Sequence, residues 1–217
     1  PACGTTPCPS RRKRCSLAGM SKHILYLAAG SGRRFGSNKL LYNWKGKSLY
    51  RYGLDMLADL IQRREDCTLT VVSSYLEIRE MAAALGARVV DSPESDKGLS
   101  FTIKSAIQAL DGFAPEDFLL FAVADQPWLG AGTVSRLLDA ARPGLLAATA
   151  AWGDRVGNPT LFSAELIPQL LDLTGDRGGR AVLEACGERC QRIQVDTPRE
   201  LEDVDTRQAL EENGSEA

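Results

Sequence analysis

Short apolar segments with the length of strands alternate with helical patterns along most of this 217-residue chain. Continuous apolar runs such as 118–124 are typical of strands that are buried on both faces. The segments between them carry apolar residues at helical spacing. Strands and helices that alternate in this way predict an α/β fold with three layers, in which a mainly parallel, Rossmann-like sheet has helices on both faces. We expect strands at 23–29, 67–73, 87–91, 117–125 and 145–152, and helices at 48–63, 75–85, 99–110 and 132–141.

The pattern after residue 153 is less regular. Gly, Asn and Pro at 157–160 indicate a turn, and a second Gly-rich loop at 176–179 precedes a helical pattern. Elements are still expected along this part of the chain. They are helices at 164–173 and 180–188, a short strand at 191–195, and a segment at 204–210 that leads into a C-terminal helix.

Length and composition favour one domain with a substantial core. Hydrophobic residues make up 44% and charged residues 25% of the chain, which are ordinary globular values. The net charge of −2, with basic residues spread along the chain, gives no indication of a nucleic-acid partner. No apolar run reaches the roughly 18 residues of a membrane span. We therefore expect a soluble, cytoplasmic protein with reduced cysteines, whose single domain spans residues 20–217.

Residues 1–19 differ from the rest in composition. They hold three prolines, three cysteines and a basic cluster at 11–14, without the apolar core of a secretory signal. Met20 resembles a natural initiator, so we interpret 1–19 as a non-native or disordered extension. A basic targeting or metal-binding tail is the alternative, although its cysteines lack the C-x-x-C pairing of zinc sites.

A Gly-rich, basic loop follows the first predicted strand. Three glycines, two arginines and a closing lysine occur within residues 30–39. Glycines expose backbone N–H groups to a phosphate chain, and basic side chains supply compensating charge. We therefore predict a phosphate-handling loop, whose basic side chains include Arg34 and Lys39. Its nucleotide-binding backbone would be Leu27, Ala28, Ala29, Gly30, Ser31 and Gly32.

The spacing of this loop excludes two common phosphate-binding motifs. A dinucleotide-binding G-x-G-x-x-G needs glycine where Phe35 stands. A P-loop ending at Gly46 would need its first glycine at Leu41. The sequence at 46–48 is better interpreted as a turn before a helix.

Carboxylates at the ends of predicted strands suggest a metal site. Asp125 follows a buried apolar strand, where a carboxylate can hold Mg²⁺ together with water and phosphate oxygens, or can cap a turn before Pro127. A second anchor is expected at Asp205, with Asp203 in reserve, although Asp205 could also cap the last helix. Asp91 is a candidate for contacts to ribose, base or metal.

Residues at four strand ends should meet in one ligand site, because open α/β sheets bind ligands beyond the carboxyl ends of their strands. These residues are Gly30, Ser73, Asp91 and Asp125. Gly98 is a further candidate for contacts to the nucleotide, and the start of the helix after it adds Ser100 and Thr102 as candidate contacts to nucleotide or acceptor. His23 is the one histidine and is expected to open the first strand, which argues against serine hydrolases and most zinc enzymes.

The loop at 27–39 resembles L-A-[AG]-G-x-[SG]-x-R-[MF]-G-x-x-K, the pattern of MobA-like nucleotidyltransferases that build molybdenum cofactors. Further segments occur in the order of that family: 98–104, 124–127, 157–159, 175–180 and 203–206. The resemblance covers almost the whole chain from Met20 and implies a GT-A-like fold. Ala28-Ala29 is similar to the CTP-using branch, the molybdenum cofactor cytidylyltransferases, whereas the GTP-using branch has Ala-Gly. Many relatives carry Gly and His where this chain has Ala124 and Asn158.

The implied reaction transfers CMP from CTP to the terminal phosphate of molybdopterin and releases pyrophosphate. The resemblance further implies Mg²⁺ on Asp125 and Asp205, a triphosphate held by Arg34 and Lys39, and a wall for the pterin at 175–180. An apo molybdenum hydroxylase would receive the product. Three alternatives remain open: a GTP-using guanylyltransferase, a sugar- or polyol-phosphate nucleotidyltransferase, and a non-catalytic carrier of the pterin cofactor.

Overall fold

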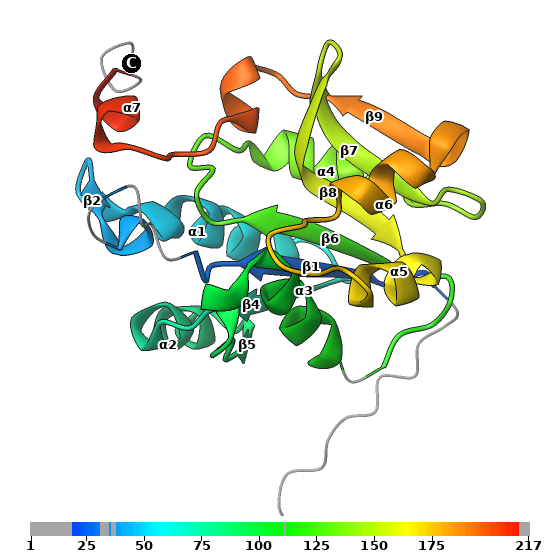
Figure 1. Cartoon of the computed structure of the whole chain (residues 1–217), viewed down its shortest axis with the longest axis horizontal. Coiled ribbons are helices and arrows are strands. Elements are labelled where there is room, and N and C mark those ends of the chain that lie inside the picture. Colours follow the sequence, from blue (N-terminus) through cyan, green and yellow to red (C-terminus); the bar gives the residue numbers. More distant parts are fainter. Residues whose placement is uncertain (1–18, 31–34, 36–37, 111, 213–217) are drawn as a thin grey trace, which may run out of the picture.

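A computed structural model describes residues 19–212 apart from 31–34, 36–37 and 111. Its centre is a seven-stranded sheet with the order β5-β4-β1-β6-β8-β7-β9 (Figure 1). Strand β8 is antiparallel to both of its neighbours, and every other adjacent pair is parallel. The strands are β1 (Lys22–Leu27), β4 (Cys67–Val72), β5 (Arg88–Val90), β6 (Phe118–Val123), β7 (Ala147–Trp152), β8 (Arg155–Ser163) and β9 (Cys190–Gln194).

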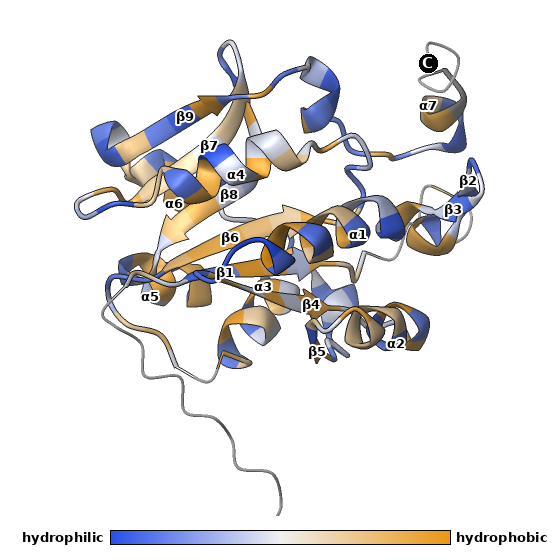
Figure 2. Ribbon diagram, turned by 180° about the vertical axis from the view of Figure 1, so that it is seen from behind, coloured by the Kyte–Doolittle hydropathy of each residue, from blue (hydrophilic) through white to orange (hydrophobic). Residues whose placement is uncertain are grey.

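Helices cover both faces of this sheet. The period of two along β1 sends Ile24 and Tyr26 into one apolar cluster and Leu25 and Leu27 into the other. Figure 2 shows the resulting apolar strands between helices that carry hydrophilic residues on their outer faces. The first cluster packs α1 (Leu49–Gln62), α2 (Leu76–Ala84) and α4 (Ala131–Asp139), and the second packs α3 (Leu99–Gln108), α5 (Ile167–Leu171) and α6 (Arg180–Ala185).

The remaining elements are short. A two-stranded hairpin of β2 (Asn43–Trp44) and β3 (Lys47–Ser48) precedes α1, and α7 (Arg207–Glu212) ends the described chain. Short 3₁₀ helices are η2 (Lys39–Leu41), η3 (Ser95–Lys97), η4 (Ala164–Leu166), η5 (Gly187–Arg189) and η6 (Pro198–Leu201). Among the described residues, no helix is both long and apolar enough to cross a bilayer.

The predicted α/β fold with a mainly parallel sheet is confirmed, and the expected turn at 157–160 is wrong. Those residues lie inside β8, which pairs with β6 and β7. Between Thr149 and Ala150 the pairing jumps from Thr160 to Gly157, so Asn158 and Pro159 form a bulge. Turn-favouring residues here interrupt the register of a strand without ending it. The helix expected at 164–173 divides into η4 and α5, and the expected C-terminal helix begins at Arg207.

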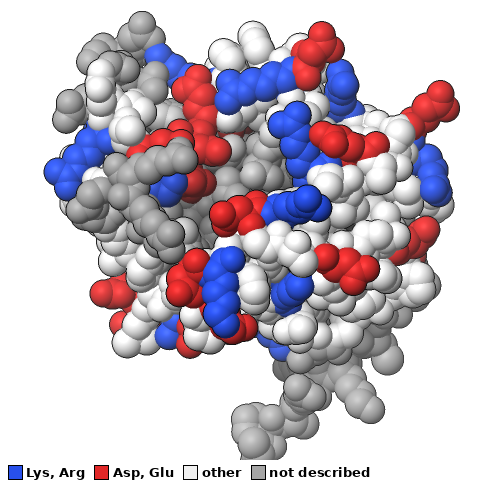
Figure 3. Space-filling view, in the orientation of Figure 1, with Lys and Arg blue, Asp and Glu red and all other residues white. Residues whose placement is uncertain are grey.

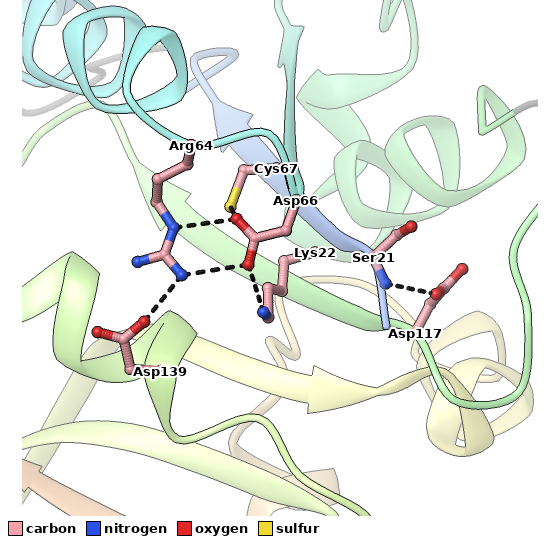
Figure 4. Close-up of polar contacts among 7 residues, drawn as sticks. All are labelled: Ser21, Lys22, Arg64, Asp66, Cys67, Asp117 and Asp139. Carbon is pink, nitrogen blue, oxygen red and sulfur yellow. Dashed lines mark hydrogen bonds and ion pairs between the residues drawn. The ribbon is translucent and has the colours of Figure 1, made fainter. Parts of the chain in front are cut away.

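A charged network joins the amino ends of β1 and β4 to α4 (Figure 4). Asp66 accepts hydrogen bonds from Lys22, from Arg64 and from the Cys67 thiol. Arg64 also donates to Asp139 at 2.8 Å. The Arg64 guanidinium holds the pKa of the Asp66 carboxyl well below its usual range, and burial raises the pKa of the Cys67 thiol to about 11.

We predict that Asp66→Asn lowers the free energy of unfolding by about 1 kcal/mol at pH 7, because a partly exposed charged network contributes only that much. The lowered pKa means that the ionised carboxylate stabilises the folded state. Its contribution is therefore complete above about pH 5 and is lost as the pH falls further. Urea unfolding measured from pH 7 to pH 3 should show a smaller loss of stability in the variant. The control Asp154→Asn removes an exposed ion pair with Arg192 and should change stability by less than about 0.5 kcal/mol.

Candidate active site

A cleft of about 480 Å³ lies at the carboxyl ends of β1 and β6, which are neighbours in the middle of the sheet. Six parts of the chain line it: the end of β1, the short helix η2, the segment before and at the start of α3, the end of β6, and two later loops that contain Asp176 and Asp205. Figure 3 shows acidic and basic side chains interspersed on one face of the molecule. The lining residues are Leu27, Ala29, Gly30, Lys39, Leu40, Ser95, Asp96, Lys97, Gly98, Leu99, Thr102, Val123, Ala124, Asp125, Asp176 and Asp205.

The Lys39 ammonium lies between two carboxylates of the cleft. Its Nζ donates to Asp125 Oδ2 at 2.7 Å and to the Val204 carbonyl at 3.1 Å. The same atom is 3.7 Å from Asp205 Oδ1. Lys39 is only 8% exposed, so its charge depends on these partners rather than on water. One cation thus reaches carboxylates from two distant segments.

Asp203, the reserve candidate, has a different partner from Asp205. Gln126 Nε2 donates to Asp203 Oδ1 at 2.8 Å, and Asp203 does not line the cleft. Loss of solvent raises the pKa of Asp203, and the charge of Asp125 raises it further. The intervening Val204 N–H donates to the Asp125 carbonyl at 2.9 Å. This bond fixes the segment that carries Asp205 against the end of β6.

The predicted phosphate loop begins at the cleft. Leu27, Ala29 and Gly30 line the cleft, whereas Ala28 is fully buried and its N–H donates to Val72 O at 2.8 Å. The alternating directions of an extended chain account for this difference. The predicted phosphate ligands Ser31, Gly32 and Arg34 lie outside the described residues.

Ser73 and Asp91 do not line the cleft, although they follow strands of the same sheet. Ser73 is fully buried, and its hydroxyl donates to the Ala28 carbonyl at 2.6 Å. Asp91 forms an ion pair with Arg79 at 2.7 Å. Both follow β4 and β5, which lie on the far side of β1 from β6. Ser73 therefore supports the backbone of the phosphate loop.

The start of α3 packs against the Gly-rich loop at 174–179. Gly98 has φ +127°, and a Cβ there would lie 2.4 Å from the Gly175 carbonyl carbon. The Ser100 N–H donates to the Gly175 carbonyl at 3.1 Å. Thr102 lines the cleft, whereas the Ser100 hydroxyl is buried and has no hydrogen-bond partner among the described residues. The contact brings the loop expected to form a wall for the acceptor to the rim of the cleft.

A second, smaller cavity of about 210 Å³ adjoins the cleft. The two share Leu27, Leu99 and Val123 as lining residues. Its remaining lining is mainly apolar, with polar groups from β7, β8 and the start of α6. These other residues are Ile103, Phe121, Thr149, Val156, Gly157, Asn158, Thr160, Phe162, Leu170, Gly178, Gly179, Arg180 and Leu183.

Some residues in the cleft or behind it have roles that the sequence does not reveal. Residues 95–97 lie between the strand expected at 87–91 and the helix expected at 99–110, and all three line the cleft. Gln126 is buried and holds Asp203 in place. Position was a signal for both, because each lies in the connection that follows a predicted strand, and Gln126 also belongs to the segment 124–127.

Comparison with known proteins yields one family and several relatives. The model of the "MobA-like NTP transferase domain" matches residues 24–192. The purine catabolism protein PucB of Bacillus subtilis is 24% identical over 190 residues, which cover 84% of this chain and 90% of PucB. The nicotine blue oxidoreductase of Paenarthrobacter nicotinovorans is 28% identical, with 83% and 90% covered.

Solved structures share the fold at low identity. A nucleotidyl transferase from Methanothermobacter thermautotrophicus superposes with a TM-score of 0.71 at 20% identity, covering 90% of this chain and 100% of that one. The molybdopterin-guanine dinucleotide biosynthesis protein A of Archaeoglobus fulgidus gives a TM-score of 0.63 at 16% identity, with 88% and 95% covered. These likenesses establish an α/β nucleotidyltransferase fold.

We predict that Gly98→Ala destabilises the protein more than Gly86→Ala does. Both glycines have positive φ, but a Cβ at Gly86 meets nothing within 4 Å. Gly86→Ala should therefore cost about 1–2 kcal/mol for the strained backbone alone. Gly98→Ala must also displace Gly175, so we expect a cost of about 3 kcal/mol or more. Denaturant unfolding measures both values, and equal costs would contradict the close approach of the two loops.

Proposed function

Since the family model covers residues 24–192, this chain belongs to the MobA-like NTP transferase family, and we propose that it transfers CMP from CTP to the terminal phosphate of molybdopterin. A nucleotidyltransferase needs a cleft that holds a triphosphate and offsets its charge. The observation that carries the proposal is the position of Lys39, which contacts Asp125 and lies near Asp205 in such a cleft.

The residues of the cleft fit a Mg²⁺ site. Lys39 Nζ is 2.7 Å from Asp125 and 3.7 Å from Asp205, so both carboxylates lie beside one cationic group and could together hold a small cation in its place. The structure gathers no group of three or more His, Cys, Asp or Glu side chains that could hold a metal among the described residues, so the protein would supply only these two carboxylates. The other ligands would be water and phosphate oxygens, as Mg²⁺ prefers. When bound, the ion would offset the charge of the triphosphate and of the developing pyrophosphate.

Lys39 would then exchange one anionic partner for another. In the structure, its ammonium neutralises the carboxylates in a poorly solvated position. With the carboxylates bound to metal, the ammonium would turn to the triphosphate in the same cleft. The backbone of Ala29 and Gly30 would lie beside the phosphates, because both residues line the cleft.

The proposed reaction needs no general base from the protein. A terminal phosphate monoester is largely dianionic near pH 7 and can itself attack the α-phosphorus. One of its oxygens forms the new bond while the bond from the α-phosphorus to the bridging oxygen breaks, and pyrophosphate leaves with that oxygen. The single histidine agrees with this scheme, since His23 lies near the amino end of β1 and contacts Thr68.

Ala29 supports CTP over GTP. It lines the cleft, and the GTP-using branch carries glycine at the corresponding position of the motif. The proposal therefore assigns the cleft to a cytidine nucleotide.

The smaller cavity is the proposed acceptor site. It adjoins the cleft across Leu27, Leu99 and Val123, so its occupant would lie beside the bound nucleotide. Apolar walls with a few polar groups suit a flat heterocycle such as a pterin. Asn158 and Arg180 are polar lining residues that could select the acceptor.

The direct test incubates the protein with Mg²⁺, each nucleoside triphosphate in turn, and molybdopterin or a sugar phosphate. We expect pyrophosphate and a cytidine dinucleotide product with CTP and molybdopterin. Asp125→Asn should lower kcat on the order of 100-fold or more by removing a carboxylate of the metal site. Asp59→Asn, an exposed change on α1, is the matched control.

Other outcomes of this assay discriminate among the alternatives. Pyrophosphate from GTP alone would show a guanylyltransferase, and pyrophosphate from sugar phosphates alone would show a different acceptor. Binding of the dinucleotide without turnover of any pair would identify a carrier. Each of these results contradicts the proposal.

We also predict that Asn158→Ala raises the KM for molybdopterin by roughly fivefold to tenfold. This is the loss of affinity expected when one hydrogen bond to the acceptor is removed. The KM for CTP should stay unchanged, because Asn158 lines only the smaller cavity. Initial rates with each substrate varied at saturating levels of the other measure both constants. An effect on the KM for CTP alone would show that the two cavities are assigned the wrong way round.

A further inference from the structure

Two loops lie side by side behind the carboxylates of the cleft. One follows β6 at 125–130, and the other runs from 196 to 205. Near the cleft they are joined by the bond from Val204 N–H to the Asp125 carbonyl and by the bond from Gln126 to Asp203. Their relative position therefore sets the distance between Asp125 and Asp205.

Glu200 joins the same two loops at their other end. It is 3% exposed, and its Oε2 accepts the Gly130 N–H at 2.9 Å. Its Oε1 accepts the N–H groups of Asp196 at 2.9 Å and Thr197 at 3.4 Å. Hydrogen bonds to a charged acceptor are the stronger kind, and three of them meet on this one buried carboxylate.

Gly130 allows this close approach. It precedes α4, and a Cβ at this position would lie 3.1 Å from Glu200 Oε2. Its own backbone angles are ordinary for any residue, with φ −89° and ψ 144°. A side chain at 130 would thus disturb the Glu200 carboxylate through crowding rather than through backbone strain.

We propose that Glu200 is a positioning residue that holds Asp125 and Asp205 at the spacing needed for a divalent cation. It touches neither the cleft nor a substrate and acts through the two loops that carry the ligands. The inference rests on the proposed function, because it concerns the same metal site. Partners that orient metal ligands typically contribute 10-fold to 100-fold in metal affinity.

The test measures Mn²⁺ binding by electron paramagnetic resonance, without substrates. Glu200→Gln keeps the shape of the side chain but replaces one acceptor oxygen with an NH₂ group that faces a backbone N–H. We expect roughly tenfold weaker Mn²⁺ binding. The matched control Glu188→Gln makes the same change on an exposed side chain and should bind Mn²⁺ as the wild type does.

Gly130→Ala tests the same contact without altering the carboxylate and remains informative if Glu200→Gln does not fold. It should weaken Mn²⁺ binding by roughly threefold to tenfold, toward the low end of the range for such partners. High Mg²⁺ should restore kcat in both variants, since a positioning defect lowers metal affinity and leaves the reacting groups intact. Thermal unfolding in EDTA shows separately how much stability each variant loses.

The outcomes separate this inference from the proposed function. Wild-type Mn²⁺ affinity in both variants, or a low kcat that saturating metal does not restore, would overturn the role of Glu200 while leaving the proposed activity intact. Wild-type protein that binds no Mn²⁺ would overturn the metal site itself and the inference with it. Wild-type metal binding without nucleotidyl transfer would overturn only the proposed reaction.

Discussion

The contact of one buried ammonium with Asp125 and its proximity to Asp205 organise the candidate site. Lys39, Asp125 and Asp205 come from segments far apart in the chain, and the charge of Lys39 is tolerated only because these segments meet. Removing either carboxylate would leave a poorly solvated cation with fewer partners. Removing the cation would leave two carboxylates repelling each other in the cleft. The same electrostatics explain why a second cation, together with an anionic substrate, could bind here.

The sheet brings the segments that carry these charged residues to one edge. Strands β1 and β6 are parallel neighbours, so their carboxyl ends open on one edge, where Gly30 and Asp125 follow them. Asp205 reaches that edge by a different route, through backbone pairing of Val204 with Asp125. Buried Glu200 joins the same two loops at their other end, where it accepts the Gly130 N–H. The fold therefore provides a rigid edge, and two loops complete the site upon it.

The sequence predicted those parts of the molecule whose signal is local. Apolar runs and helical spacing indicated the strands and helices of the α/β sheet, and Lys39, Asp125 and Asp205 were expected together at its edge. The antiparallel β8 was missed, because Asn158 and Pro159 favour turns while pairing with β7 and β6 is a long-range effect. Strand order was also not encoded locally, so Ser73 and Asp91 were expected in the cleft that they do not line. Thr197 and Glu200 have the spacing of a capping box for η6, but the sequence does not show that Glu200 also contacts Gly130.

A crystal structure with Mg²⁺ and a CTP analogue that resists cleavage would show directly whether the cleft holds a metal and a triphosphate. We expect the metal between Asp125 and Asp205, in contact with triphosphate oxygens, and the Lys39 ammonium turned from the carboxylates to the phosphates. The cytosine should lie in the cleft lined by Ala29, with the smaller cavity left open for an acceptor. A metal bound elsewhere, or a nucleotide bound while Lys39 still bridges the two carboxylates, would contradict this expectation.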